Sequence, residues 1–391
     1  MLCWRKIIQS LIIITFQLFE TDNFVAPGCL TLNIKCMKKV SIFLFVLLSL
    51  ISCRNEAYKN ESALTGSKVP QFDTADMTNN FYDNTETYPL PLKDLIIEGE
   101  ISNPGKVDFT GLPKHSVIVK ETLLDSSGLD RFVGAYRYDG YSLFDILDNK
   151  ILRKANGAEF KPIIDLYIEV ENDKGEKVIF SWGEIYYPNN LHKIIIATDV
   201  SRIVPSKTKD LWPLPSESKI VAASDLITER NIGSPVKITV RSYPRSFKVD
   251  RNMTAMNAPD IRIFRNSEQL DIIKKLPSEI DSQTFNTIFY GRGRGIHSTT
   301  PFSGILLKDL LLKYYPFSSE NLKSGVLCLA GIDGYRCAFS YSEIFNRNDQ
   351  QEFLLITSKP GEDGGLYRVF AACDFFSDRA VKSLNEIHFG N

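Results

Sequence analysis

The sequence has no excess of basic residues, which would indicate a nucleic-acid-binding protein, and few cysteines, which would indicate a disulfide-rich one. Its 46 Lys and Arg residues are nearly balanced by 47 Asp and Glu residues, and a formal net charge of −1 gives no electrostatic argument for nucleic acid as a partner. Cysteine is scarce. Beyond residue 53 only Cys328, Cys337 and Cys373 remain, and an odd number excludes a complete disulfide framework.

Two further absences concern metal sites and disulfides. Outside a glycine-rich loop the histidines are isolated, with no spacing typical of a zinc site: His115, His192 and His388. Cys328 and Cys337 flank Asp333–Gly334, which predicts a two-residue hairpin turn that would place Cys337 opposite Ala330. The three cysteines are therefore expected to be small buried residues, with a Cys328–Cys337 disulfide as the alternative.

The N-terminal region lacks a hydrophobic run of membrane-spanning length. The apolar segment Val40–Ser52 is too short for a typical spanning helix, and it follows the basic pair Lys38–Lys39. It ends in Leu50–Cys53, which looks like the lipobox of bacterial lipoproteins, where the cysteine is acylated and becomes the new N-terminus. An ordinary cleaved signal peptide or a short anchor helix is the alternative.

These features predict how the N-terminal region is organised. Residues 1–36 are expected to be an extension before the true start, and residues 37–53 a lipoprotein signal peptide with lipid attachment at Cys53. Residues 54–89 are poor in aliphatic side chains and are expected to form a flexible tether. We therefore expect a protein that is lipid-anchored in a bacterial cell envelope. It should face the periplasm, because no strong acidic run follows the cysteine.

The rest of the chain, whose strand-like runs are broken by Gly, Pro, Asn and Asp, carries a repeated pattern. Four blocks occur twice in the same order: YDGYSLFDIL (138–147) and FSGILLKDLL (302–311), EKVIFSWGEI (176–185) and YRCAFSYSEI (335–344), KIIIAT (193–198) and EFLLIT (352–357), AASDLITER (222–230) and AACDFFSDR (371–379). The repeat predicts a tandem duplication with domains at residues 90–243 and 258–391.

Most recurring residues in these blocks have a structural explanation. Gly140 is expected to allow a tight turn from a strand into a helix, and Asp145 to bind nearby backbone amides, with a catalytic Asp as the alternative. Capping boxes and turn-stabilising ion pairs are expected at four repeated pairs: Ser181 with Glu184, Ser340 with Glu343, Asp225 with Arg230, and Asp374 with Arg379. No Gly-x-Ser-x-Gly elbow surrounds either serine, so neither is expected to be a nucleophile.

One loop has a different character. GRGRGIHSTT (291–300) combines three glycines, which can expose backbone amides, with Arg292, Arg294 and His297. Such a loop is suited to hold a phosphate or another small anion, and a solvated loop between two strands is the alternative. The matching stretch of the first copy, DSSGLDRFVG (125–134), contains a single arginine, Arg131. If one copy binds an anion, it is therefore the second.

Taken together, the blocks resemble a known family. LIIEGEISNPGKVDFTGLP (95–113), the two aromatic-x-Gly blocks, GIDGYRCAFSYSEI (331–344) and GGLYRVFAACDFFSDRAVKSLNEIHF (364–389) are similar to motifs of the sulfite-oxidase-type molybdopterin-binding domain. The resemblance implies an α+β fold of two tandem mixed-sheet domains. It also implies molybdenum-dependent redox chemistry, in which a protein cysteine thiolate completes the ligands of the metal.

The resemblance also implies where a cofactor would lie. Gly365 and Arg368 match the family's G-x-x-R, and Arg292, Arg294 and His297 lie near the place of its metal and phosphate, which makes these five residues candidate cofactor contacts. The stretches that should carry the metal-ligand cysteine, 117–138 and 285–302, contain none.

The missing cysteine shapes the expected function. No catalytic residue and no metal ligand is expected, and molybdopterin is either held without the thiolate or lost. The chain is expected to be a degenerate, non-catalytic pair of domains that binds a small anionic ligand or an envelope protein. The alternatives are an active or cofactor-binding molybdopterin oxidoreductase and, with less support, an envelope adhesin or structural lipoprotein.

Overall fold

The computed structural model of the chain describes residues 85–205, 207–253, 256–358 and 365–390, all within one compact unit, Asp73–Asn391. The expected signal peptide and Cys53 lie outside these residues. Strand β1 (Thr87–Pro89) falls within the segment expected to be a tether and pairs with a strand of the first copy. No helix among the described residues has the length and apolarity needed to cross a membrane.

The expected fold class was wrong. The structure is mostly β: of the described residues, 43% lie in strands and 11% in helices. All described strands except one two-stranded pair belong to four blade-like sheets of four or five strands each. The prediction of an α+β fold rested on the resemblance of several short motifs to the sulfite-oxidase-type domain, and helices were expected in the leucine-rich blocks. These blocks form only the short helices α4 (Leu143–Asp148) and α6 (Leu307–Leu311), because the strand before each one extends into the block.

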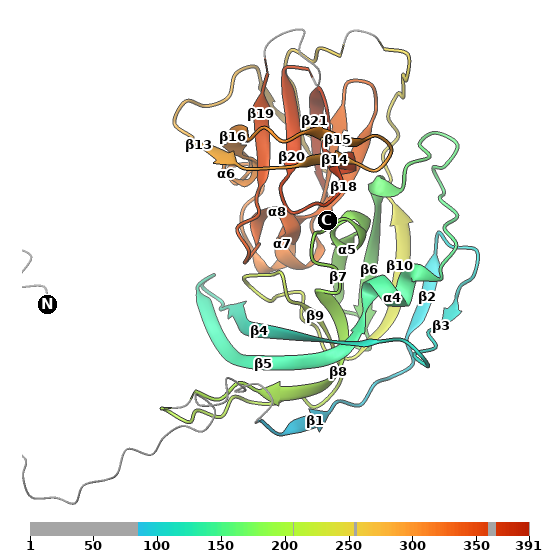
Figure 1. Cartoon of the computed structure of the whole chain (residues 1–391), viewed down its shortest axis with the longest axis vertical. Coiled ribbons are helices and arrows are strands. Elements are labelled where there is room, and N and C mark those ends of the chain that lie inside the picture. The colour runs from blue at the N-terminus through green and yellow to red at the C-terminus, as the bar shows by residue number, and fades with distance from the viewer. Residues whose placement is uncertain (1–84, 206, 254–255, 359–364, 391) are drawn as a thin grey trace, which may run out of the picture. The chain divides into compact units, whose positions relative to one another are not determined.

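The first copy contains two sheets (Figure 1). One has the order β1-β8-β5-β4, with β9 beside β8, and consists of β4 (Lys114–Leu124), β5 (Asp130–Ser142), β8 (Ile194–Arg202) and β9 (Lys219–Ala222) besides β1. The other has the order β3-β2-β10-β6-β7 and consists of β2 (Ile96–Gly99), β3 (Gly105–Lys106), β6 (Leu166–Asn172), β7 (Lys177–Ser181) and β10 (Pro235–Ser242). Strands β2 and β10 are parallel, and the other pairs are antiparallel.

The second copy repeats this plan. Its first sheet has the order β13-β16-β19-β20, from β13 (Ser282–Phe285), β16 (Phe302–Leu306), β19 (Phe353–Thr357) and β20 (Tyr367–Ala371). Its second has the order β12-β11-β21-β17-β18, from β11 (Ile261–Arg265), β12 (Glu268–Ile273), β17 (Val326–Gly331), β18 (Arg336–Ser340) and β21 (Leu384–Gly390). Strands β11 and β21 are the parallel pair here, at the place of β2 and β10.

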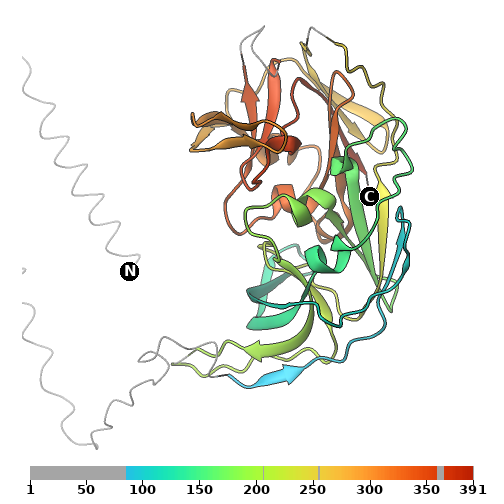
Figure 2. The same cartoon turned by 45° about the vertical axis from the view of Figure 1, so that its right-hand side comes forward.

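Short helices connect the strands. They are α5 (Trp182–Tyr186), α7 (Ser319–Ser324), α8 (Tyr341–Phe345) and the 3₁₀ turns η1 (Ile163–Asp165) and η2 (Ser377–Arg379), besides α4 and α6. Capping boxes start α5 at Ser181 and α8 at Ser340, each with both bonds formed, which confirms the prediction from the two Ser-x-x-Glu pairs. Figure 2 shows α5 and its neighbours between the strands of the two copies.

Gly140 has another role than expected. It lies inside β5, where a Cβ atom would come within 2.1 Å of the Ile196 carbonyl oxygen of β8. A Cβ atom on Gly304, its counterpart in β16, would lie 2.4 Å from the Leu355 carbonyl oxygen of β19. The aromatic-x-Gly pattern therefore permits close approach of two strands rather than a turn into a helix.

The cysteines follow the expectation in burial but not in register. Cys328, Cys337 and Cys373 are all buried and free, so no disulfide forms between them. Cys337 lies opposite Leu329, not Ala330. The loop between β17 and β18 spans Ile332–Tyr335 instead of a two-residue turn, and this shifts the pairing by one residue.

A reciprocal interface joins the two copies, and a fully buried arginine of the first copy forms one half of it. Arg230 makes ion pairs with Asp225 at 2.6 Å and Glu184 at 3.0 Å. The pair with Asp225 confirms the prediction from the five-residue spacing. Its Nη1 also donates to Ser340 Oγ of the second copy at 3.1 Å. The guanidinium of one copy thus contacts the serine that caps α8 of the other.

Arg379 forms the other half with the corresponding partners. It is fully buried, makes ion pairs with Asp374 and Glu343, both at 2.7 Å, and donates to Ser181 Oγ of the first copy at 3.3 Å. Backbone hydrogen bonds between the copies also come in equivalent pairs. In one pair, Leu226 N donates to Asn346 O and Phe375 N donates to Tyr187 O, both at 2.7 Å. In the other pair, Asn348 N donates to Ser224 O and Asn189 N donates to Cys373 O, both at 3.0 Å. The copies therefore pack through equivalent surfaces.

Candidate anion-binding site

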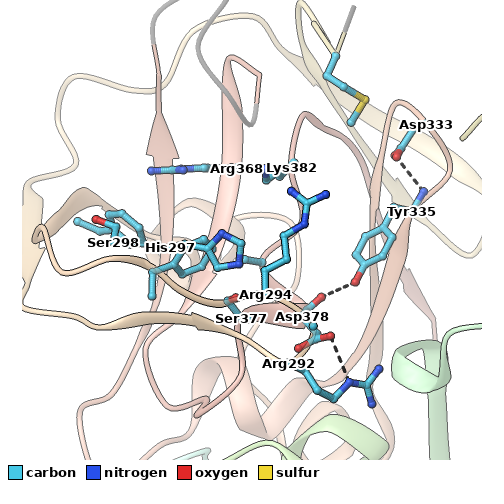
Figure 3. Close-up of a pocket in the computed structure, with 16 residues that line it drawn as sticks. Arg292, Arg294, His297, Ser298, Asp333, Tyr335, Arg368, Ser377, Asp378 and Lys382 are labelled. Carbon is cyan, nitrogen blue, oxygen red and sulfur yellow. Dashed lines mark hydrogen bonds and ion pairs between the residues drawn. The ribbon is translucent and has the colours of Figure 1, made fainter. Parts of the chain in front are cut away.

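A cavity of about 590 Å³ opens in the second copy beside the glycine- and arginine-rich loop (Figure 3). Its walls come from this loop, from the start of β20, from the β17–β18 loop and from the η2 region. The lining residues are Met256, Phe289, Gly291, Arg292, Gly293, Arg294, His297, Ser298, Phe302, Asp333, Tyr335, Arg368, Ser377, Asp378, Ala380 and Lys382.

The loop itself is a small β-hairpin. Strands β14 (Phe289–Gly291) and β15 (Gly295–Ser298) pair antiparallel, and Arg292–Arg294 form the turn. Gly295 has a φ of +74°, a left-handed conformation that glycine adopts without strain. A Cβ atom on Gly291 would lie 2.5 Å from His297 Nε2, so this glycine lets the imidazole approach the backbone of the opposite strand.

Positive charge gathers at this cavity from separate parts of the chain. The hairpin supplies Arg292 and Arg294, strand β20 supplies Arg368, and the segment after η2 supplies Lys382. The Arg368 guanidinium carbon lies 4.7 Å from the centre of the Phe302 ring, a cation–π contact that orients this side chain. Figure 3 shows Arg294 extending on the side of the hairpin where Arg368 and Lys382 lie, whereas Arg292 points the opposite way, beside Asp378.

Two carboxylates balance part of this charge. Asp378 Oδ1 lies 3.7 Å from Arg292 Nε, and Asp333 accepts a bond from the Tyr335 backbone amide. Among the described residues that line the cavity, four are Arg or Lys and two are Asp. Burial raises the pKa of Tyr335, so its hydroxyl stays protonated and donates to the Asp378 carbonyl oxygen at 2.6 Å.

The structure brings together four of the five residues expected to contact a cofactor. Arg292, Arg294, His297 and Arg368 line one cavity, whereas Gly365 does not. Gly365 has a φ of +72°, and a Cβ atom there would lie 2.5 Å from Ser383 Oγ, so its part is to let the backbone pass close to that side chain. Lys382 also lines the cavity, although it was not predicted as a cofactor contact. It lies within the family-like motif 364–389, which could have pointed to it.

The corresponding hairpin of the first copy lacks this cluster. Strands β4 and β5 pair up to their tip, with one register shift between Glu121 and Thr122. The Asp125 backbone amide donates to the Leu129 carbonyl oxygen across the turn at 2.8 Å. The Asp125 carboxylate accepts the backbone amides of Ser127 at 2.8 Å and Leu129 at 3.0 Å, so the tip presents an acidic side chain where the second copy presents arginines. That the second copy is the one to bind an anion, if either copy does, stays a prediction.

The described cysteines do not serve this cavity. None of Cys328, Cys337 and Cys373 lines it, and burial raises the pKa of all three thiols, so they are not thiolates at neutral pH. The lining therefore suits the phosphate end of a pterin cofactor, through its arginines. It does not suit the metal end, which needs a soft thiolate ligand.

The first copy contains a second polar cluster, which the sequence did not predict. His115 and His192, expected to be isolated, both lie beside Asp145, and their rings stack with centroids 4.0 Å apart. Burial, followed by the neighbouring His115, lowers the pKa of His192. Strand pairing between distant segments creates the cluster, so no local spacing could have revealed it.

No protein-family model matches the chain, and no match was found among curated proteins. The function proposed below therefore rests on the residues and geometry of the cavity.

Proposed function

We propose that the protein is a non-catalytic binding module that holds a small anionic molecule in the cavity of its second copy. One observation carries this proposal: Arg292, Arg294, Arg368 and Lys382, from separate parts of the chain, all line one cavity of about 590 Å³. That volume is within the range of small-molecule sites in proteins. Guanidinium and ammonium groups that line one cavity can bind the negative groups of a ligand through charge-assisted hydrogen bonds.

The lining also indicates the chemistry of the ligand. Arginine binds phosphate and carboxylate groups through two parallel N–H donors, which favours a ligand with such a group. Phe289, Phe302 and Tyr335 add aromatic surface to the same cavity. A phosphorylated or carboxylated molecule with a planar or apolar part would use both kinds of wall.

Molybdopterin is a second candidate ligand, favoured by the resemblance of Arg368 and the hairpin residues to the family's cofactor contacts. It would be held through its phosphate by the arginines. When bound in a catalytic family member, such a cofactor supplies redox chemistry at molybdenum. No step of that kind is proposed for this chain, because no described cysteine lines the cavity. Molybdenum analysis and pterin fluorescence on protein from a cofactor-competent bacterium test this candidate directly.

The anion site itself is tested with pyrophosphate as the probe. Calorimetric titration of the full chain, purified in mild detergent, should show one site whose affinity falls as salt rises. Arg294→Gln should weaken binding roughly tenfold or more, because a charge-assisted hydrogen bond contributes about 1.5–3 kcal/mol. Arg294 is exposed, so its replacement should not disturb the fold.

The matched control is Arg131→Gln, since Arg131 is an exposed arginine on the corresponding hairpin of the first copy. It should leave pyrophosphate binding unchanged. Equal losses in both variants would show general charge attraction, and no saturable binding in the parent protein would refute the proposed site.

We also propose that a lipid on Cys53 holds this module at the cell envelope, facing the periplasm. The lipobox-like Leu50–Cys53 is the observation behind this proposal. Incorporation of a labelled fatty acid that is lost in Cys53→Ser would support it, and an unlabelled parent protein would contradict it.

A further inference from the structure

The cluster of His115, Asp145 and His192 in the first copy has the geometry of a metal site. His115 Nε2 lies 2.8 Å from Asp145 Oδ2, and His192 Nδ1 lies 3.4 Å from the same oxygen. The candidate ligand atoms of the three residues all lie within 4.8 Å of one another. Ser142 Oγ is also part of the cluster, 3.0 Å from His192 Nδ1.

These distances suit a single small cation. Zn²⁺ binds imidazole nitrogen and carboxylate oxygen at about 2.0–2.2 Å, so two ligand atoms in a tetrahedral site lie roughly 3.3 Å apart. The separations of 2.8 and 3.4 Å lie on either side of that value, and small side-chain rotations would lengthen the shorter one. The side chains of His115, Asp145 and His192 are 25%, 16% and 31% exposed, which leaves a path for an ion and room for a water ligand.

The second copy serves as an internal reference for the two histidines. His115 pairs with Gly140 across β4 and β5, and the equivalent partner of Gly304 is Gln283. His192 stands directly before the KIIIAT block, and Gln351 stands directly before EFLLIT. The second copy thus forms the same elements with glutamine at both positions. The fold therefore does not require His115 and His192 for packing.

The carboxylate, in contrast, is present in both copies. Asp145 lies in the first turn of α4, and Asp309 lies at the same place in α6. Only the first copy combines this carboxylate with two imidazoles. Two histidines and one carboxylate form a ligand set that binds Zn²⁺ and related divalent ions while leaving coordination positions open.

We propose that the first copy binds one divalent transition-metal ion, with Zn²⁺ as the reference ion, through His115 Nε2, His192 Nδ1 and Asp145. The remaining coordination position is left for water or an exogenous ligand. This site is formed by other residues than the arginine-lined cavity, so it can be present or absent whatever the outcome there.

The test uses the full chain without a histidine tag, titrated with ZnCl₂ by calorimetry and with CoCl₂ by visible absorption. We expect one bound ion per chain, and a Co²⁺ spectrum of nitrogen and oxygen ligation without a thiolate charge-transfer band. His115→Gln and His192→Gln install the residues of the second copy. Each should weaken binding roughly tenfold or more, given that even indirect partners of metal ligands change affinity 10–100-fold.

Asp309→Asn is the matched control for Asp145→Asn, because Asp309 is exposed at the equivalent position of the other copy. It should keep full Zn²⁺ affinity, whereas Asp145→Asn should lose it. A thermal shift induced by Zn²⁺ in the parent and absent from folded His115→Gln would support the site independently. Unchanged affinity in both histidine variants, or no binding by the parent up to millimolar Zn²⁺, would overturn the proposal.

Discussion

Arg230 and Arg379 are each buried completely, yet neither lacks compensation. Each of these two guanidinium groups makes ion pairs with two carboxylates of its own copy and donates a hydrogen bond to one serine hydroxyl of the other copy. A charge taken out of water is tolerated only with such partners, because desolvation would otherwise exceed the electrostatic gain. The stability of both copies should therefore depend on these two side chains.

Replacing Arg379 by Gln should lower the free energy of unfolding by about 3–5 kcal/mol, since Asp374 and Glu343 would remain buried without their cation. Urea denaturation followed by tryptophan fluorescence measures the loss. Where the Gln variant does not fold, Arg379→Lys keeps the charge and should give an intermediate loss.

Arg241→Gln is the control for this substitution. Its side chain is 48% exposed and lies 3.8 Å from Glu169, so the loss should stay below about 1 kcal/mol. A similar small loss in Arg379→Gln would show that the buried network contributes little.

The sequence revealed only part of this network. The five-residue spacing of each Asp–Arg pair and the three-residue spacing of each capping box are local patterns, and both were predicted correctly. The bond from Arg379 to Ser181 joins residues 198 positions apart, and no local period reports it. The same reason explains why the His115–Asp145–His192 cluster was missed.

At the scale of elements, the hairpin β14–β15 decides where the arginines lie. In the first copy the equivalent strands continue to their tip, whereas in the second copy β13 and β16 end and a separate two-stranded hairpin follows. Tyr290 of this hairpin packs near Phe375 and Phe376, with ring centroids 5.7 and 6.1 Å away. These contacts fix the hairpin against the segment that leads into η2.

Gly291→Ala should lower pyrophosphate affinity several-fold, because the new methyl group would meet His297 Nε2 at 2.5 Å and push the ring from its place. Gly293→Ala is the matched control in the same turn, where a Cβ atom would meet no atom within 4 Å. Calorimetry with pyrophosphate and a melting curve for each variant give the comparison. Equal affinities in the two variants would mean that the position of His297 does not matter for the ligand.

The strands and the cationic loop were foreseeable, but the fold class was not. Runs of β-branched residues predicted the strands, and three glycines with two arginines predicted the character of the hairpin. The fold class was inferred from the resemblance of several short motifs to a family, and two of these motifs have leucines at helical spacing. In the structure these leucines belong to helices of five or six residues, which cannot cover a sheet. Lys382 and Tyr335 reach the cavity only through the tertiary arrangement.

At the scale of the whole molecule, the two copies form one compact unit through equivalent contacts. The connection between them passes through Arg251 and Asn252, which are exposed. A protease site introduced at these residues should allow cleavage without separation, because the buried arginine network and the paired backbone bonds remain intact.

Size-exclusion chromatography of the cleaved protein should show both fragments eluting together at the position of the intact chain. The cleaved Arg379→Gln variant should separate at a lower urea concentration than the cleaved parent. Immediate separation of the parent fragments in buffer would show that the covalent connection, rather than the interface, holds the copies together.

The reciprocity of Arg230 with Ser340 and of Arg379 with Ser181 has a consequence for quaternary structure. In an isologous dimer the same surface patch of both subunits forms the interface, so each contact occurs twice with the subunits exchanged. The contacts between the two copies follow this pattern. The chain thus has the arrangement of a homodimer whose two subunits are joined by one covalent connection. One half now gathers arginines, and the other gathers histidines.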